Sequence, residues 1–311
     1  MSPQCTRYVK GKFFLNDSGL SVSTNNKLLL QPFLDKTLFA YNDIIYSLGK
    51  GMAQRNLDMP SFKKIIIPVP PLSEQQRIVL ELDLLSSIIE KKKVQLKEYD
   101  QLAQSIFFDM FGDPVTNEKG WEVKTLGELA LVKTGPFGSM LHKQDYISNG
   151  IPLVNPIHMK DFHIIADMDF TISDEKAMEL DKYILQKGDV IFARRGDIGR
   201  CAVVTGKENG YLCGTGSLFV RFVVEVVSTY IMYIIRSSSF KNELVSNAKG
   251  ATMLNLNSSI VEDLRFPLPP LSLQQSFASK IEAIDRQKAL IQQSINEVET
   301  LFNSRMDYYF N

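Results

Sequence analysis

Two stretches of the chain, Pro68-Val69-Pro70-Pro71-Leu72-Ser73-Glu74-Gln75-Gln76 and Pro267-Leu268-Pro269-Pro270-Leu271-Ser272-Leu273-Gln274-Gln275, are nearly the same. They lie 199 residues apart, and each leads into a long segment with helical apolar periodicity. Because proline fixes φ and lacks an amide donor, each stretch should stop a strand and form a rigid, extended elbow before the helix. An internal duplication is the simplest explanation, so we expect a chain built from two related halves.

Each long segment carries apolar residues at alternating steps of four and three, the spacing of a coiled-coil seam. The first seam is Ile78, Leu82, Leu85, Ile89, Lys92, Leu96, Tyr99, Ala103, Ile106 and Met110. The second, each member 199 residues further on, is Phe277, Ile281, Ile284, Lys288, Ile291, Ile295, Val298, Phe302, Arg305 and Tyr309. We expect the two seams to pack against each other and to leave the other helix faces for partner proteins.

The ends of the first long helix have their own signals. Ser73 and Gln76 have the spacing of a capping box, which predicts that the helix begins there, and Glu74 suits the positive end of a helix dipole. Gly112 and Pro114 are natural terminators, so the helix should end near Phe111.

The remaining segments differ in pattern. Strand-like runs at 12–15, 27–34 and 38–46 predict that residues 1–64 form a small, mostly β piece. Residues 113–265 alternate short β-like runs, at 189–193, 201–205 and 218–224, with helical patches at 174–182 and 228–248. This pattern favours an α+β globular domain.

Composition limits the location and the partners. The 311 residues are 44% hydrophobic and have a formal net charge of zero, so the chain lacks the overall basic character of a simple nucleic-acid binder. Cys5, Cys201 and Cys213 have neither a metal-type spacing nor an even number, which favours a reducing compartment. The sequence shows no signal peptide and no membrane span, and we expect a cytoplasmic protein.

Several motifs occur together with the repeated elbow. They are residues 106–114, Gly120-Trp121, Thr125-Leu126-Gly127-Glu128, residues 188–199 and residues 250–256. With them, nearly the whole chain resembles the specificity subunits of type I restriction-modification systems. The resemblance implies α+β target-recognition domains joined by two long antiparallel coiled-coil helices. It also implies a non-catalytic subunit without a cofactor, which directs methyltransferase and restriction nuclease-translocase subunits to a split site in double-stranded DNA.

The 199-residue offset predicts the domain boundaries. Residues 1–67 would be a partial first target-recognition domain, 68–112 the first elbow and spacer helix, 113–266 the second target-recognition domain, and 267–311 the second elbow and spacer helix. Residues 1–64 match only the part of the second domain beyond Arg200, so the first domain is expected to lack its amino-terminal half. The alternative is a truncated half-reader or structural decoy that docks methyltransferase chains and pairs with a second copy through its helices.

Candidate DNA contacts lie in three loops of the second domain. A glycine-containing loop lets backbone amides approach phosphate, and arginine can bind guanine or phosphate through two parallel hydrogen bonds. The candidates are Lys133, Thr134, Gly135, Ser139, His142 and Lys143, then Arg194, Arg195 and Arg200, and finally Lys249, Thr252 and Asn255. Each loop also suits a purely structural role, and an ion pair between Arg195 and Asp197 within a tight turn is one such alternative.

Catalytic and metal-binding interpretations have weaker support. Asn155-Pro156-Ile157-His158 shares only its first two residues with the Asn-Pro-Pro-aromatic motif of adenine methyltransferases, and no glycine-rich cofactor loop follows a strand. His142, His158 and His163 lack partners at the spacing of a zinc site. We therefore expect neither an autonomous methyltransferase nor a metal protein.

Overall fold

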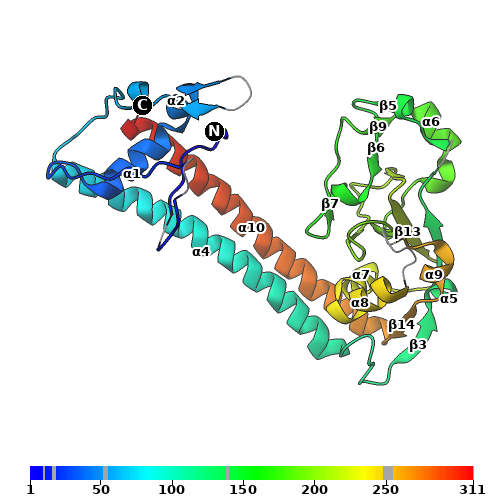
Figure 1. Ribbon diagram of the computed structural model, residues 1–311. Helices are drawn as coiled ribbons and strands as arrows, with labels where there is room; N and C mark the ends of the chain where they lie inside the picture. Colours follow the sequence, from blue (N-terminus) through cyan, green and yellow to red (C-terminus); the bar gives the residue numbers. More distant parts are fainter. Residues whose placement is uncertain (10, 16–18, 52–54, 138–139, 248–254, 311) are drawn as a thin grey trace. The chain divides into compact units, whose positions relative to one another are not determined.

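The computed structural model describes residues 1–9, 11–15, 19–51, 55–137, 140–247 and 255–310 (Figure 1). Two compact units are present: Met1–Tyr99 with Arg286–Asn311, and Asp100–Asp285. The long helices α4 (Leu72–Phe111) and α10 (Leu271–Phe310) contribute to both units. These helices together with small helices and sheets confirm the predicted α+β class. No helix in the described ranges combines the length and apolar content of a membrane span.

Helix α4 begins one residue before the predicted position, and α10 begins at the equivalent residue, 199 positions further on. The carbonyl of Pro71 accepts the first helical hydrogen bonds of α4, and the carbonyl of Pro270 accepts those of α10. Ser73 therefore lies within the first turn and is not its cap, and Gln76 is exposed. The predicted end is correct, because α4 stops at Phe111 and the next residue, Gly112, has the positive φ of 76°.

In the first unit, the start of α4 packs against the end of α10, which makes the two helices antiparallel. Ile78 and Leu82 belong to one apolar cluster with Phe310, and Ile89 packs with Ile295 in the next. Leu85, Ile281, Ile284 and Ile291 are also buried in their units, and Leu96, Tyr99 and Val298 are half-buried. Full burial of one such aliphatic side chain contributes roughly 1.5–3 kcal/mol.

The seam shifts by one residue near the end of each helix. The alternating pattern predicts Ile106 and Met110 in α4, but Phe107 and Phe111 are the buried residues, at 1% and 2% exposure. Consecutive steps of four from Ala103 replace the predicted step of three. Such a four-residue insertion locally unwinds a coiled coil, and here it brings two large aromatic rings into the interface.

The same shift occurs in α10, where Met306 and Phe310 are buried in place of Arg305 and Tyr309. These residues lie 199 positions beyond Phe107 and Phe111, so the irregularity is part of the repeat. In the second unit, Phe111 lies against Phe277 and Tyr230, with ring centroids 5.3 and 4.6 Å apart. Aromatic contacts of this kind favour tilted and edge-on rings over face-to-face stacks.

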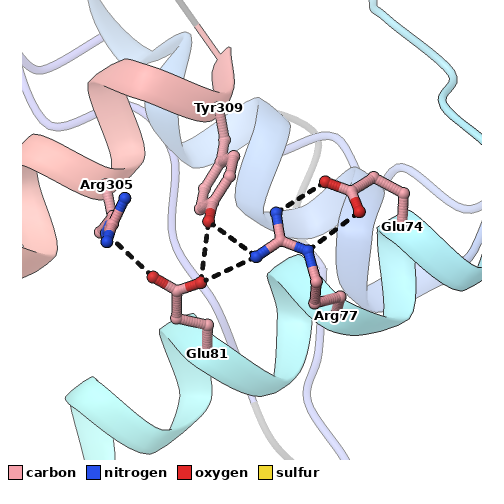
Figure 2. Close-up of polar contacts among 5 residues, drawn as sticks. All are labelled: Glu74, Arg77, Glu81, Arg305 and Tyr309. Carbon is pink, nitrogen blue, oxygen red and sulfur yellow. Dashed lines mark hydrogen bonds and ion pairs between the residues drawn. The ribbon is translucent and has the colours of Figure 1, made fainter.

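The displaced Arg305 and Tyr309 form a polar network with the start of α4 (Figure 2). Arg77 donates two hydrogen bonds to Glu74, at 2.9 and 2.7 Å, and lowers the pKa of that carboxyl. Arg77 and the hydroxyl of Tyr309 both donate to Glu81, and Arg305 pairs with the other oxygen of Glu81 at 3.0 Å. Exposed single pairs contribute little, but this connected set fixes the register between the helix ends.

The predicted β character of residues 27–46 is wrong. This segment forms α1 (Gln31–Ala40) and α2 (Asn42–Ser47), followed by a two-stranded sheet of β1 (Gly49–Lys50) and β2 (Asn56–Leu57) and the short helix α3 (Met59–Phe62). Phe33, Thr37, Tyr41 and Ile45 recur every four residues and are buried, which is helical spacing. Pro32 suits the first turn of a helix, so it starts α1 and does not interrupt it.

Two four-stranded sheets form the body of the second unit. The first has the order β11 (Cys201–Val203), β10 (Val190–Ala193), β13 (Ser217–Phe222) and β4 (Ala130–Thr134), all antiparallel. The second has the order β12 (Leu212–Cys213), β6 (Ile151–Val154), β9 (Thr171–Ile172) and β5 (Tyr146–Ile147). Every residue of β10 is buried, so this strand lies in the core and positions the loop that follows it.

Shorter elements surround the sheets. They are α5 (Leu126–Leu129), η2 (Lys143–Asp145), η3 (Pro156–His158), the hairpin β7 (Met159–Lys160) with β8 (His163–Ile164), α6 (Asp174–Glu179), η4 (Asp181–Tyr183), α7 (Ser228–Arg236), α8 (Ser238–Asn247) and α9 (Ser258–Glu262). Antiparallel β3 (Glu122–Thr125), which follows α4, and β14 (Arg265–Leu268), which precedes α10, pair with each other. Glu128 caps α5 by accepting from the amide and hydroxyl of Thr125, and the Trp121 indole donates to the Phe111 carbonyl that ends α4.

The internal repeat is visible in the element order. The series α1, α2, α3 and α4 corresponds to the series α7, α8, α9 and α10. Gln75 and Gln274, 199 residues apart, are buried and make equivalent hydrogen bonds to the elbow. Both copies therefore share local structure as well as sequence.

Candidate nucleic-acid interface

One end of the first sheet brings together loops that are distant in sequence. Ala193, the last residue of β10, pairs with Ser217, the first residue of β13. Leu218 then pairs with Thr134, the last residue of β4. Because neighbouring strands are antiparallel, the segments after Ala193 and Thr134 leave the sheet at the same end. We call this region the sheet-end cluster; it comprises Thr134, Gly135, Arg194, Arg195, Ser217 and Asn255.

Arg194 is the buried centre of the sheet-end cluster. Its side chain is only 8% exposed, and its Nε donates to Asn255 Oδ1 at 3.3 Å. Its backbone amide donates to Gly216 and its carbonyl accepts from Leu256, so the main chain is fixed on both sides. Within the described residues, Arg194 makes no ion pair with a carboxylate. Burial, with the adjacent positive charge of Arg195, lowers the pKa of the Arg194 guanidinium.

Two further groups of the sheet-end cluster have unused hydrogen-bonding capacity. Arg195 is exposed and pairs with Asn255 through a backbone bridge, and in the described part of the chain its guanidinium has no ion pair. The hydroxyl of Ser217 is buried and has no hydrogen-bond partner among the described atoms. Buried polar groups in proteins are nearly always paired. Arg195 therefore offers donors to a ligand, whereas the Ser217 hydroxyl is enclosed by the protein.

Arg200 has a mainly structural arrangement. Its guanidinium donates to Asp197 at 3.1 Å and to the carbonyl of Pro156 at 3.1 Å, which fastens the turn after Arg195 to the neighbouring turn. Lys241 also pairs with Asp197 at 3.0 Å. Hydrogen bonding from Lys241, then from Arg200, keeps the pKa of Asp197 below its usual value. Asp197 therefore pairs with Arg200 and Lys241, and the suggested pair with Arg195 is not formed.

Gly135 has a packing role that the sequence did not indicate. Its amide donates to the carbonyl of Ser217 at 3.0 Å, and a Cβ added at this position would overlap the carbonyl oxygen of Gly214. The glycine therefore permits close approach of two backbone segments, and its amide is already used. Lys133 reaches the carbonyl of Lys182 at 3.5 Å.

The other candidates lie away from the described cluster or outside the described residues. His142 and Lys143 are exposed at the start of η2, where Asp145 accepts from the His142 amide at 2.6 Å. Ser139, Lys249 and Thr252 fall in ranges that the structure does not describe.

The Asn155-Pro156-Ile157-His158 motif has a structural explanation. The side-chain oxygen of Asn155 accepts from the Gly216 amide at 3.2 Å, which supports the loop before Ser217. His158 is buried, with its Nδ1 2.7 Å from the Leu153 carbonyl. No group of three or more His, Cys, Asp or Glu in the described ranges could hold a metal ion.

A cleft of about 430 Å³ on the other side of the 195–200 turn was missed by the sequence interpretation. Phe162, Arg236 and Lys241 line it together with Arg200. These residues come from a hairpin, two helices and a turn, and no local spacing in the sequence connects them. The only sequence signal was that Arg236 and Lys241 share a helical patch with few other charges.

The chain is similar in sequence to two specificity subunits. It is 22% identical over 298 residues to the MjaVIII specificity subunit of a type I restriction enzyme from Methanocaldococcus jannaschii, covering 88% of this chain and 69% of that relative. It is 25% identical over 289 residues to the StySPI specificity subunit from Salmonella potsdam, covering 85% of this chain and 60% of that relative. The chain thus spans 60% to 69% of the length of these relatives.

A solved structure has the same fold. The S subunit of the type I restriction-modification system from M. genitalium superimposes with a TM-score of 0.58 at 15% identity, covering 92% of this chain and 74% of that one. The family model described as "Type I restriction modification DNA specificity domain" matches residues 6–98 and 118–300, which is most of the sequence. The chain therefore belongs to the family of type I restriction-modification specificity proteins.

Proposed function

We propose that this chain is a DNA-recognition subunit that binds one part of a split target sequence through the sheet-end cluster. The observation that carries the proposal is Arg194, a buried guanidinium without a carboxylate partner in the described part of the chain. Removing such a charge from water is costly unless it is paired. An acceptor on DNA would supply the missing partner, and family membership makes DNA the ligand to test.

The geometry suits direct recognition of a base pair. Arginine bound through two nitrogens to the O6 and N7 of guanine is the commonest specific contact in the major groove. The Nε of Arg194 is held by Asn255, which orients the guanidinium and leaves its two terminal nitrogens for this contact. Arg195, exposed beside it, can reach a phosphate or a second base edge.

Family membership and the exposed surfaces of the long helices suggest which proteins bind this chain. Beside the buried seams, α4 exposes Leu80 and Leu84 by 70% and 62%, and α10 exposes Leu290 by 60%. Apolar side chains grouped on an exposed face mark protein-binding surfaces. In our proposal these faces dock methyltransferase subunits, a restriction nuclease-translocase subunit joins the complex, and the chemistry belongs to those partners. The expected cytoplasmic location is part of the same proposal.

The proposal is tested by the affinity of the complex with its methyltransferase partner for duplex DNA. Arg195→Ala should weaken binding to the specific duplex by about tenfold and have less effect on a duplex without the site. Lys207→Ala, at an exposed position of the same unit, is the matched control and should have no effect. Equal binding of the two duplexes by the wild-type complex would refute sequence recognition.

A further inference from the structure

The cleft beyond the 195–200 turn has a positive lining. It lies between the β7–β8 hairpin, this turn and the helices α7 and α8, and its basic residues are Lys160, Arg200, Arg236 and Lys241. Two carboxylates, Asp161 and Asp197, also line it, so the formal charge of the lining is +2 from four positive and two negative groups. A single anionic group is therefore the favoured occupant.

Arg236 is stacked on aromatic rings in the wall of the cleft. Its guanidinium carbon lies 3.3 Å from the ring centroid of Phe162 and 4.4 Å from that of Tyr233. Its Nε is buried without a hydrogen-bond partner among the described residues, and no carboxylate there pairs with it. Stacked on aromatic rings, a guanidinium can still bind an oxyanion through its edge. Arg236 lines the cleft and is only half-buried, so an oxyanion in the cleft can reach the edge of its guanidinium.

The hairpin that covers Arg236 is closed by a tight two-residue turn. Asp161 and Phe162, the two residues between β7 and β8, both have positive φ, at 47° and 66°. A two-residue hairpin loop of this kind requires positive φ at both central positions, and a bulky residue such as Phe162 rarely occupies one of them. The turn places the Phe162 ring over the Arg236 guanidinium, where it forms one wall of the cleft.

Lys241 and Arg200 line the cleft and share one carboxylate partner. Both bind Asp197, so one carboxylate is shared by two cations, and their combined charge is only partly neutralised. Lys160 is exposed at the rim and has no ion pair in the described part of the chain. The cleft can therefore receive negative charge without breaking the Asp197 contacts.

From this geometry we infer that the cleft binds one backbone phosphate of DNA, with Arg236 as its principal ligand. The inference rests on the proposed function, because the 195–200 turn joins the cleft to the sheet-end cluster. Arg195 and Arg200 are five positions apart, so their Cα atoms are separated by at most about 18 Å, and each DNA strand carries a phosphate every 3.4 Å along the helix axis. A phosphate near the base pair contacted by Arg194 thus lies within reach of the cleft.

The test uses the complex with its methyltransferase partner and duplexes with and without the specific site, over a series of salt concentrations. Arg236→Gln should weaken binding to both duplexes by a similar factor, about tenfold, and reduce the salt-dependence slope by about one. Lys160→Gln, at the rim and away from any packed core, should act in the same direction, which covers the case that Arg236→Gln fails to assemble. Lys207→Gln is the control. Unchanged affinity and slope for both cleft variants would overturn the inference.

Removing the charge of single DNA phosphates tests the contact with Arg236 more directly than the salt dependence does. Single phosphates of the specific duplex are replaced by neutral methylphosphonates, one position at a time. At one position the replacement should weaken wild-type binding but have little further effect on Arg236→Gln, because both changes remove the same contact. Additive losses at every position would contradict a phosphate in the cleft.

Three outcomes separate this inference from its alternatives. If inorganic phosphate raises the thermal midpoint of the wild-type chain but not of Arg236→Gln, while DNA affinity is unaffected by the variant, the cleft is a free-anion site and the inference is wrong. If the wild-type complex does not distinguish the two duplexes, the proposed function itself fails. Retained discrimination with no effect of the cleft variants rejects the cleft alone.

Discussion

Gln75 and Gln274 make the same two hydrogen-bonding contacts in the two copies of the repeat. The side-chain amide of Gln75 donates to the Pro70 carbonyl at 2.7 Å, and its oxygen accepts from the Leu30 amide at 2.8 Å. Gln274 donates to the Pro269 carbonyl at 2.8 Å and accepts from the amide that precedes α7 at 3.0 Å. Each glutamine thus ties a proline elbow to the start of an earlier helix, and both are almost fully buried.

Replacing this glutamine should destabilise the second unit. Gln274→Leu leaves the Pro269 carbonyl and the Val227 amide without their buried partner, at a cost of about 1–3 kcal/mol in the free energy of unfolding. Urea denaturation measures the change. Gln275→Leu, at the exposed neighbouring position, should change the free energy by less than about 0.5 kcal/mol. Equal effects of the two variants would show that the contacts of Gln274 contribute nothing to stability.

The shifted seam predicts which residue of α4 matters most at its carboxyl end. Phe107→Ala should cost about 3–5 kcal/mol, because Phe107 is 1% exposed and contacts the rings of Tyr233 and Phe277. Ile106→Ala should cost much less, since Ile106 is only half-buried. Thermal unfolding followed by circular dichroism distinguishes the two. A larger loss of stability for Ile106→Ala than for Phe107→Ala would show that the seam keeps its regular spacing through Ile106.

Gly135 offers a test of packing at the sheet-end cluster. Gly135→Ala introduces a methyl group that would overlap the Gly214 carbonyl, so the backbone must move, and overpacking of this kind costs about 1–3 kcal/mol. The variant should also weaken DNA binding, because the segment next to Arg194 shifts. Gly206→Ala is the control, since an added Cβ there meets no atom within 4 Å. Wild-type stability of Gly135→Ala would remove the packing argument.

The three cysteines should differ in reactivity. Burial raises the pKa of Cys201 to about 12 and raises that of Cys213 further, so neither forms appreciable thiolate at pH 8. Cys5 is only half-buried. We expect a disulfide reagent to modify one thiol per folded chain and all three in denaturant. Rapid modification of three thiols in the native protein would contradict the burial of Cys201 and Cys213.

The features that the sequence predicted are local or repeated. The elbows, the long helices, the end of α4 at Phe111 and the strands around residues 190, 201 and 218 all depend on neighbouring residues. The apolar runs at 27–34 and 38–46 predict strands, because a short apolar run suits a strand as well as a helix. The four-residue spacing from Phe33 to Ile45 identifies a helix only when the burial of these residues is known. The sequence also does not show that Gln75, and not Gln76, is the buried glutamine of the elbow, because this depends on a hydrogen bond with Leu30, 45 residues away.

The candidate site was predicted only in part. Arg194 and Arg195 are predicted because arginine can bind guanine or phosphate through two parallel hydrogen bonds, but their proximity to Thr134 depends on strand pairing through β13. The packing role of Gly135 requires Gly214, which is 79 residues away. The cleft at Arg236 depends on the unusual φ angles of Asp161 and Phe162, which sequence periodicity does not predict.

Sequencing of DNA methylation tests the central claim most directly, in cells that carry this chain with its methyltransferase partner. Recognition by the sheet-end cluster predicts that one recurrent DNA sequence is methylated only when the chain is present. It also predicts that replacing both Arg194 and Arg195 by alanine abolishes or relaxes that pattern, whereas Lys207→Ala preserves it. An identical methylation pattern without the chain, or full site-specific methylation by the double arginine variant, would contradict the account.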